Sequence, residues 1–282
     1  MESLIDYTQN LIFKFEFSSD GNFIKDTFHL DYESNKYREK DLVSLIRDTV
    51  PYFALTEEEF SDLESIDQMR IAWSRISKAQ KNKKGDYGEL LLFLILLVYY
   101  KAPKLVTKVR LRTSTTLQIN GYDCAHFTIE DDEPVLWIGE SKFHQSFSSA
   151  LTHSITSLNE HCNVLFTSDE LSILKPNLEI NKENKEIFQR LQSIFRGKSI
   201  DKIKFKVPVL LTYDSKCIKN NVETNEKFKS ELIQELEKLY GSIDEKEIVT
   251  DIRNIDFIFL VFPFEAVSNI KDSLENIENI LR

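Results

Sequence analysis

The chain has 282 residues, of which 41% are hydrophobic and 29% are charged, a composition that excludes a disordered or collagenous protein and is typical of one large or two modest globular domains. It holds only 7 glycines and neither a GxGxxG nor a GxxxxGK(S/T) motif, which argues against a dinucleotide-binding or P-loop enzyme. Three scattered cysteines and an N-terminus without a signal peptide favour a cytoplasmic protein with no disulfide framework and no CxxC zinc site.

The net charge of −10 is unevenly distributed along the chain. Residues 1–69 have a net charge of −10, residues 70–112 of +9, and residues 113–282 of −9. Because salt at physiological ionic strength screens charges beyond about 8 Å, an acidic protein of this kind can present a local positive surface. The basic block is therefore either such a surface or a set of solvated helix faces.

The N-terminal part of the chain has the patterns of two strands and two helices. We expect strands over 11–17 and 22–30 and a helix over 40–48. Pro51 should close that helix. Thr56, followed by three Glu residues, has the form of a capping box and predicts a second helix that continues to about Ser77.

The most apolar segment follows a basic connector. Residues 90–100 (LLLFLILLVYY) form a run of about half the roughly 20 residues that a membrane-spanning helix needs. We therefore expect no membrane contact, and a helix over 85–100 that is apolar nearly all round and lies inside the protein. Pro103 should end this helix.

The rest of the chain has the patterns of alternating strands and helices. We expect strands over 106–112, 117–129, 135–143, 206–213 and 256–264, and helices over 146–162, 187–195, 225–240 and 266–282. The acidic segment 130–134 is expected to be a hairpin turn. This order predicts an α/β core over residues 70–282, with a mixed central sheet flanked by helices. The acidic residues 1–69 either extend that sheet or pack against it as a small subdomain.

Two charged residues interrupt a strand that should be buried. The segment 135–143 (VLWIGESKF) holds Glu140 and Lys142, and because side chains alternate between the faces of a strand, both point to the same side. Buried charges are costly unless they are paired or bound to a metal. The pattern indicates either a structural ion pair at a strand end or part of a chemical site.

A second carboxylate, Asp123, precedes the hairpin turn in the string GYD. Residues at equal distances from a hairpin turn lie side by side, so Asp123 is expected beside Glu140. Two carboxylates on one face repel each other unless a cation lies between them, and carboxylate oxygens are the ligands that Mg²⁺ prefers. The hairpin therefore predicts a divalent metal site.

Glu89 is a third carboxylate, in the first turn of the apolar helix. Its side chain should lie near the core, and Gly85 and Gly88 beside it allow the backbone to approach closely. The alternative is that Asp86 and Glu89 only complement the helix dipole, a contribution of about 0.3 to 1 kcal/mol.

A Glu on a helix, then an Asp, then Glu-x-Lys on the next strand resembles the PD-(D/E)xK nuclease superfamily, with Glu89, Asp123, Glu140 and Lys142 at the matching positions. The strings GDYGELLL, GYDCAHF and WIGESKFH, all within residues 80–162, resemble the HamA family, the nuclease subunits of Hachiman-type antiphage defence systems. The resemblance implies a restriction-endonuclease-like α/β fold and metal-dependent endonucleolytic hydrolysis of DNA. Tyr122 stands where the superfamily's name has proline, a position that varies among such enzymes.

The resemblance also implies roles for the individual residues. Asp123, Glu140 and the backbone carbonyl of Ser141 would hold Mg²⁺, for which Mn²⁺ is expected to substitute. The ion would polarise the scissile phosphate and lower the pKa of a bound water. Lys142 would orient that water or stabilise the developing charge, and Glu89 would hold a second ion or fix the metal ligands from behind.

The basic block supplies candidate contacts to DNA phosphates on both sides of the apolar helix. These candidates are Lys81, Lys83 and Lys84 before the helix, and Lys101, Lys104, Lys108, Arg110 and Arg112 after it. No base-reading motif is visible, so we expect weak or absent sequence specificity.

The histidines near these residues have different expected roles. His144 continues the face of Glu140 and Lys142 and is a further candidate for a phosphate contact, whereas His126 should point to the opposite face. A zinc site formed by His153, His161 and Cys162 is disfavoured because their spacing fits no ligand pattern.

The resemblance also implies a partner, since HamA-like proteins are encoded with HamB, a superfamily 2 helicase. The alternative is a non-catalytic nucleic-acid- or partner-binding subunit of a helicase complex, in which the Glu, Asp and Lys residues form a structural polar cluster. An enzyme with another nucleophile is disfavoured, because no GxSxG motif and no activated cysteine is apparent.

Overall fold

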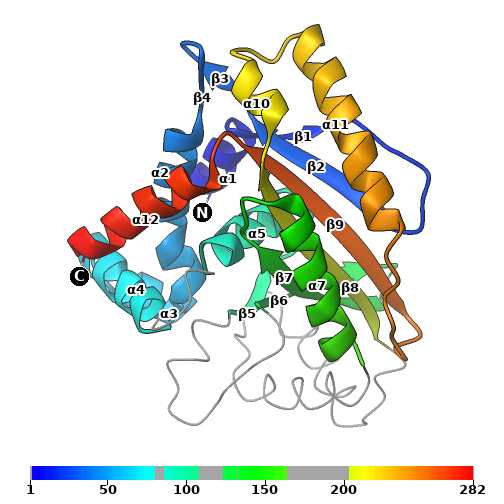
Figure 1. Cartoon of the computed structure of the whole chain (residues 1–282). Coiled ribbons are helices and arrows are strands. Elements are labelled where there is room, and N and C mark those ends of the chain that lie inside the picture. The colour runs from blue at the N-terminus through cyan, green and yellow to red at the C-terminus, as the bar shows by residue number, and fades with distance from the viewer. Residues whose placement is uncertain (1, 80–85, 108–122, 132, 164–202, 282) are drawn as a thin grey trace.

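The computed structural model describes residues 2–79, 86–107, 123–131, 133–163 and 203–281. Its centre is a seven-stranded sheet with the order β1-β2-β9-β8-β7-β6-β5 (Figure 1). The strands are β1 (Ile12–Phe15), β2 (Ile24–Leu30), β5 (Lys104–Thr107), β6 (Cys124–Glu130), β7 (Glu133–Lys142), β8 (Lys204–Asp214) and β9 (Ile255–Phe264). Strands β2, β9, β8 and β7 are parallel, and the outer pairs are antiparallel. The predicted mixed-sheet α/β fold is confirmed.

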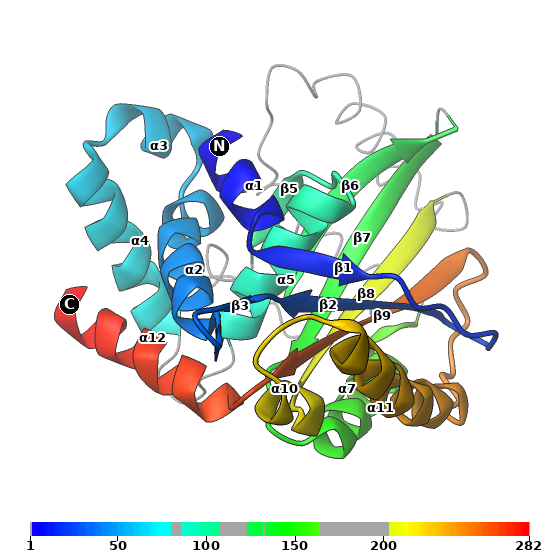
Figure 2. The same ribbon diagram turned by 90° about the horizontal axis from the view of Figure 1, so that it is seen from above.

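Helices cover both faces of this sheet and one of its ends (Figure 2). They are α1 (Glu2–Gln9), α2 (Glu39–Ala54), α3 (Glu57–Asp62), α4 (Ser65–Ala79), α5 (Asp86–Tyr99), α7 (Phe147–His161), α10 (Lys216–Asn220), α11 (Glu226–Asp244) and α12 (Val267–Leu281). A short hairpin of β3 (Tyr32–Glu33) and β4 (Lys36–Tyr37) lies outside the main sheet.

Alternating residues of the strands show which helix covers which face. On β2, the Phe28 ring lies 4.9 Å from the ring of Tyr99 on α5, whereas the Thr27 hydroxyl lies 2.7 Å from that of Tyr240 on α11. On β7, the Trp137 ring lies 5.3 Å from the ring of Tyr100, just past α5. Helix α5 therefore packs on one face, and α7 and α11 pack on the other.

The apolar helix is buried, as predicted. Every residue from Leu90 to Leu96 on α5 is at most 1% exposed, so this helix contributes its whole circumference to the hydrophobic core. Among the described residues, no helix combines the length and apolar character needed to cross a membrane.

The acidic N-terminal part extends the main sheet. Strand β2 pairs in parallel with β9, with Ile24 opposite Ile258, and β1 forms the edge beside β2. Of the two arrangements that the sequence left open, extension of the sheet is therefore the one observed for β1 and β2.

The prediction that Pro51 closes a helix is wrong, because α2 continues through it to Ala54. Proline removes one backbone donor and costs about 3 kcal/mol or more inside a helix. The helix resumes with the Leu55 amide donating to the Pro51 carbonyl at 3.0 Å, and Val50, Pro51 and Phe53 are buried. The burial of this apolar turn outweighs the lost hydrogen bond.

The single helix expected from Thr56 to about Ser77 is also wrong, although its capping box is present on α3. Two helices, α3 and α4, meet at Leu63. The Gln68 amide donates to the carbonyls of Phe60 and Leu63 at 2.7 and 3.0 Å, so a side chain satisfies carbonyls that would otherwise bond to a continuing helix.

The remaining predicted elements differ from the observed helices and strands mainly in where they begin and end. Helices α7 and α11 begin after the caps Ser146 and Asn225. Helices α1 and α10 and the β3–β4 hairpin were not predicted. The helix predicted over 187–195 lies outside the described residues.

Candidate metal centre at the end of the β6–β7 hairpin

The hairpin brings Asp123 and Glu140 together. Its register pairs Cys124 with Gly139 at the last paired position, and Asp123, one residue further, lies close enough to Glu140 for its charge to raise the pKa of Glu140. The Asp123 amide donates to the Gly139 carbonyl at 2.9 Å, one residue out of the strand register, so Asp123 lies at the end of the ladder beside Glu140. The turn is tight because Asp131 adopts a left-handed conformation with φ of 50°. Counting from the turn thus predicts the observed proximity of the two carboxylates.

The Asp123 carboxylate is held at the end of β7 by Ser141. Its Oδ2 accepts hydrogen bonds from the Ser141 amide at 2.8 Å and from the Ser141 hydroxyl at 3.0 Å. Both residues are 8% exposed. A carboxylate that accepts two donors keeps a fixed orientation at low conformational cost, so the sheet holds this group in place beside Glu140.

Glu140 and Lys142 lie on the α7 face of the sheet and form an ion pair. Glu140 is 5% exposed. Burial, together with the negative charge of Asp123, raises the pKa of Glu140 to about 7, against the opposing effects of Lys142 and of a hydrogen bond from Ser157 on α7. The pair of carboxylates therefore carries more negative charge than Lys142 alone offsets.

Helix α5 places Glu89 close to the same strand end. A Cβ added at Gly88 would lie 3.1 Å from both the Ser141 Oγ and the Phe143 Cβ, so a larger residue here would push this turn of the helix and β7 apart by a few tenths of an ångström. Glu89 follows directly and is 3% exposed. The predicted carboxylate thus lies on the first turn of a helix packed against Ser141, on the face of the sheet opposite to Glu140.

Helix α12 contacts both the start of α5 and the end of β7. The Tyr87 hydroxyl donates to the Glu278 carboxylate at 2.9 Å in a buried contact. Seven residues earlier on α12, the Lys271 ammonium lies 5.6 Å from the centre of the Phe143 ring. The C-terminal helix therefore supports both elements that carry the predicted site.

The two histidines differ as the alternation predicts. His126 is fully buried, and its Nδ1 lies 2.8 Å from the Ala102 carbonyl. Burial lowers the pKa of His126 to about 4, so this ring is a neutral core group. His144 is only half-buried, and its ring lies 5.1 Å from that of His153 on α7.

One of the lysines expected to contact phosphate has a structural role. The Lys104 ammonium donates to the Tyr52 carbonyl at 2.6 Å and to the Leu55 carbonyl at 2.7 Å. It satisfies carbonyls at the end of α2, a structural role that the sequence did not indicate, and a phosphate contact at Lys104 stays a prediction. Lys81, Lys83 and Lys84 lie outside the described residues.

The chemistry available to a metal comes from two carboxylates and a backbone carbonyl. Within residues 2–79, 86–107, 123–131, 133–163 and 203–281, no three His, Cys, Asp or Glu side chains form a group that could hold a metal ion. Mg²⁺ commonly binds through one or two carboxylates and keeps several waters. Asp123 and Glu140, with the carbonyl of Ser141, the residue after Glu140, fit that requirement.

Sequence reasoning missed the groups that α7 and α12 bring to this strand end. Ser157 bonds to Glu140, and its hydroxyl lies 3.2 Å from the Nδ1 of His161. His153 and Lys271 lie near His144. The helical spacing that located α7 marks its apolar face, and nothing in that spacing distinguishes Ser157 or His153 from other polar positions.

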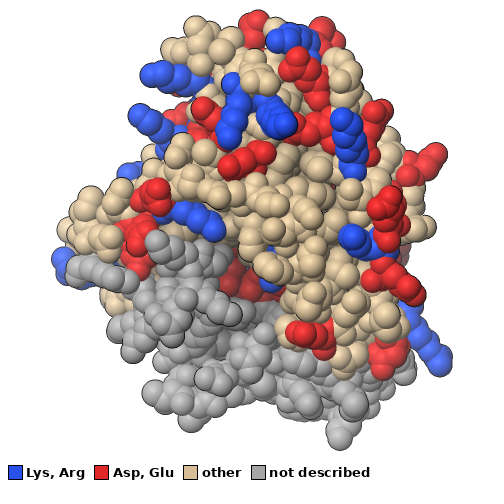
Figure 3. Space-filling model, in the orientation of Figure 1, with Lys and Arg blue, Asp and Glu red and all other residues tan. Residues whose placement is uncertain are grey.

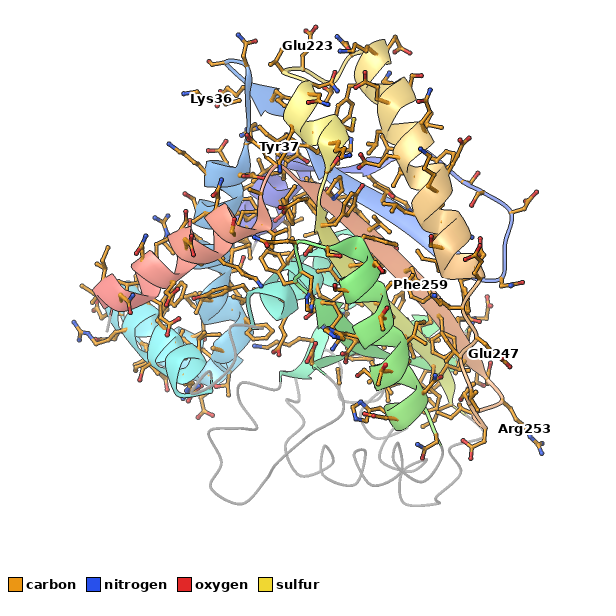
Figure 4. All side chains as sticks on the ribbon, in the orientation of Figure 1. Lys36, Tyr37, Glu223, Glu247, Arg253 and Phe259 are labelled. Atoms are coloured by element: carbon orange, nitrogen blue, oxygen red, sulfur yellow. The ribbon has the colours of Figure 1, made fainter. Side chains whose placement is uncertain are left out.

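A separate groove lies away from the β6–β7 hairpin. It has a volume of about 880 Å³ and runs between the β3–β4 hairpin, the start of α2 and α12. Tyr37 and Lys36 lie on its hairpin side (Figure 4). The Tyr37 hydroxyl accepts from the Leu30 amide at 2.8 Å, so this side chain also ties the hairpin to β2. None of the predicted catalytic residues lines this groove.

The chain was compared with known proteins and protein families. No curated protein matches it. The model of the HamA family matches residues 6–277, which is nearly the whole chain and includes the helix, the hairpin and the helices around the site. The chain therefore belongs to the HamA family, and this membership supports a role in antiphage defence.

Proposed function

We propose that the chain is a metal-dependent nuclease that hydrolyses DNA phosphodiester bonds, as the effector subunit of an antiphage system that acts with a helicase partner. The observation that carries the proposal is the position of Asp123 beside Glu140, with Ser141 and Lys142 next to them. Two buried carboxylates with a single neighbouring ammonium favour the binding of a cation.

In this proposal, some residues of the hairpin bind the metal and others hold the metal ligands in place. Asp123 and Glu140, with the Ser141 carbonyl, would hold Mg²⁺ or Mn²⁺. When bound, the ion would polarise the scissile phosphate and lower the pKa of a bound water. The hydrogen bonds from Ser141 to Asp123 and from Ser157 to Glu140 fix the directions of the two carboxylates, which is the usual task of groups behind the metal ligands.

Lys142 and Glu89 have supporting roles in this proposal. Lys142 is 22% exposed at the side chain, so its ammonium can move from Glu140 to a phosphate oxygen and stabilise the charge that develops there. Glu89, on the turn of α5 packed against Ser141, would hold a second ion or fix the metal ligands from behind.

The charge distribution fits a nuclease that depends on a partner. The net charge of −10 makes the chain a poor non-specific DNA binder. A helicase that brings a separated strand to the site would remove this barrier. The helicase partner itself rests on the resemblance to the HamA family.

Cleavage of a plasmid tests the proposal. The chain, its helicase partner, ATP and Mg²⁺ would be incubated with supercoiled DNA, and the Glu140→Gln and Asp123→Asn variants compared with wild type. We expect loss of cleavage in both. Glu237→Gln, an exposed residue of α11, is the matched control and should cleave normally. Equal cleavage by all of these proteins would refute the nuclease assignment.

The ion pair between Lys142 and Glu140 favours one second candidate, a non-catalytic subunit in which these charges only stabilise the strand end. Calorimetry with Mn²⁺ separates the two. A nuclease site binds Mn²⁺ in the wild type and loses it in Asp123→Asn, while the exposed control Asp20→Asn keeps it. Absence of binding in the wild type would favour the non-catalytic subunit.

A further inference from the structure

Basic side chains from three separate elements meet beyond the end of β7. Lys142 ends the strand and His144 follows it. His153 comes from α7, and its ring centre is 5.1 Å from that of His144. Lys271 comes from α12, where its ammonium lies 5.6 Å from the ring of Phe143, the neighbour of His144. Three elements thus bring four basic groups to one place.

The charged groups that shift the pKa of His144 show that the basic residues lie close to its ring. Burial lowers the pKa of His144, and His153, Lys271 and Lys142, in that order, lower it further. Each of the charged groups that shift this histidine is basic. Several groups with N–H donors gathered around one point beside the strand end suit the binding of an anion.

The surface next to this cluster is nearly free of charge. Helix α7 holds Glu160 as its single acidic residue and has no Lys or Arg. The middle of the face that α7 occupies is correspondingly uncharged over a wide area, whereas Lys, Arg, Asp and Glu gather over α10 and α11 (Figure 3). An approaching anion therefore meets little repulsion from α7.

We infer that His144, His153 and Lys271 form a subsite that binds a phosphate group of DNA next to the phosphate cleaved at Glu140 and Lys142. The inference rests on the proposed function and adds a binding site to it. His144 lies two residues beyond Lys142, and its amide donates to the Lys142 carbonyl at 3.1 Å, so the chain turns just past the strand end and keeps His144 next to Lys142. Imidazole N–H groups and an ammonium donate to phosphate oxygens and carry no base information, so the subsite positions DNA without reading its sequence.

Binding of DNA without cleavage tests this subsite. The full chain would be titrated into a short fluorescein-labelled duplex in EDTA, and the anisotropy followed over a range of salt concentrations. Lys271→Gln and His153→Gln should each weaken binding by about tenfold. In Lys271→Gln, the slope of log K against log salt should fall by about 0.9 for the lost phosphate contact. Lys238→Gln, an exposed lysine of α11, makes the same charge change and should leave affinity and slope near wild type.

Conservative variants separate binding from support of the fold. Lys271→Arg keeps a cation and His153→Arg places one there, so both should bind at the wild-type level or above, which a purely structural role would not predict. Unchanged affinity in both Gln variants, or an equal effect of Lys238→Gln, would overturn the subsite. Competition by an acidic peptide but not by DNA would also overturn it, in favour of a protein partner.

The outcome is distinguishable from failure of the nuclease proposal. If wild type binds the duplex through these residues but does not cleave it with metal and the helicase partner, the subsite stands and the nuclease assignment fails. If wild type cleaves DNA and the Gln variants bind it normally, the nuclease assignment stands and the subsite fails.

Discussion

Two lysine–carboxylate pairs, one at each side of the sheet, differ in whether their charges are balanced. Lys25 on β2 pairs with Asp244 at the end of α11, and its side chain is 1% exposed. Asp244 also accepts from the Asn22 amide at 3.1 Å, and the Lys25 ammonium lies 5.6 Å from the centre of the Tyr240 ring. This pair joins residues 219 positions apart, and its charges balance.

The pair at Glu140 and Lys142 lies within one strand and does not balance. Asp123 adds a second carboxylate beside it and raises the pKa of Glu140. The difference teaches that a buried ion pair does not by itself mark a functional site. What marks the site is the excess carboxylate, because it leaves a negative charge that the fold does not neutralise.

The largest effect is expected at the balanced pair. Asp244→Ala leaves the Lys25 ammonium buried without its partner, which typically costs about 3–5 kcal/mol. Urea denaturation followed by circular dichroism would measure the loss. Glu140→Gln removes a carboxylate that Asp123 repels, so it should cost much less. A larger loss at Glu140 than at Asp244 would reverse the comparison.

At the unbalanced pair the main effect should be on catalysis. Lys142→Ala removes a donor to the developing negative charge, and loss of such a donor costs about 10²- to 10³-fold in rate. Lys206→Ala is the matched control, since Lys206 bonds both oxygens of Glu130 at 2.7 Å near the opposite end of β7. Single-turnover cleavage would measure both variants. A comparable drop in Lys206→Ala would show that any ion pair of the sheet matters equally.

A raised pKa away from the β6–β7 hairpin should affect only stability. Burial raises the pKa of Glu39 to about 7, and its carboxylate accepts from the Glu265 amide at 2.6 Å. Because the folded-state pKa exceeds the ordinary value of 4.5, the contribution of Glu39 to stability is complete below pH 4.5 and is lost as the pH rises through 7. The loss is about 2–3 kcal/mol.

Denaturation at several pH values would test this. Glu39→Gln keeps an acceptor oxygen for the Glu265 amide and should flatten that part of the pH profile without changing cleavage. An unchanged profile would show that Glu39 does not titrate in this range. Loss of cleavage would place Glu39 in the chemistry and weaken the contrast with Glu140.

The smallest effects should come from two helical glycines. Gly88→Ala brings a methyl group to 3.1 Å from Ser141 and Phe143, and such overpacking typically costs about 1–3 kcal/mol. Gly241→Ala on α11 meets nothing within 4 Å and should stabilise by about 0.5–1 kcal/mol. Thermal unfolding would measure both. A neutral Gly88→Ala would show that α5 does not need its close approach to β7.

Much of this arrangement could be predicted from the sequence. Hydrophobic patterns predicted the strands of the sheet and the buried helix α5, and counting back from the turn placed Asp123 beside Glu140. These features depend on local periodicity, which the sequence displays directly. The roles of Glu89, Asp123, Glu140, Ser141 and Lys142 in metal binding and catalysis stay predictions.

The remainder depended on contacts between distant segments. Pro51 stays inside α2 because the turn around it is buried, and propensity contains no information about that burial. The break at Leu63 depends on the side chain of Gln68. Ser157, His153 and Lys271 reach the end of β7 only because α7 and α12 fold back onto it, and their positions in sequence do not reveal this.

The contacts of α12 also determine which changes in its sequence the protein can tolerate. Lys271 and Glu278 lie two turns apart and so project from one side of the helix, toward Phe143 and Tyr87 respectively. Deletion or insertion of a single residue between them would rotate one contact by about 100° relative to the other. Substitutions on the outer side of α12 should therefore be accepted readily, whereas a change in its length would detach the helix from one of the two elements that it supports.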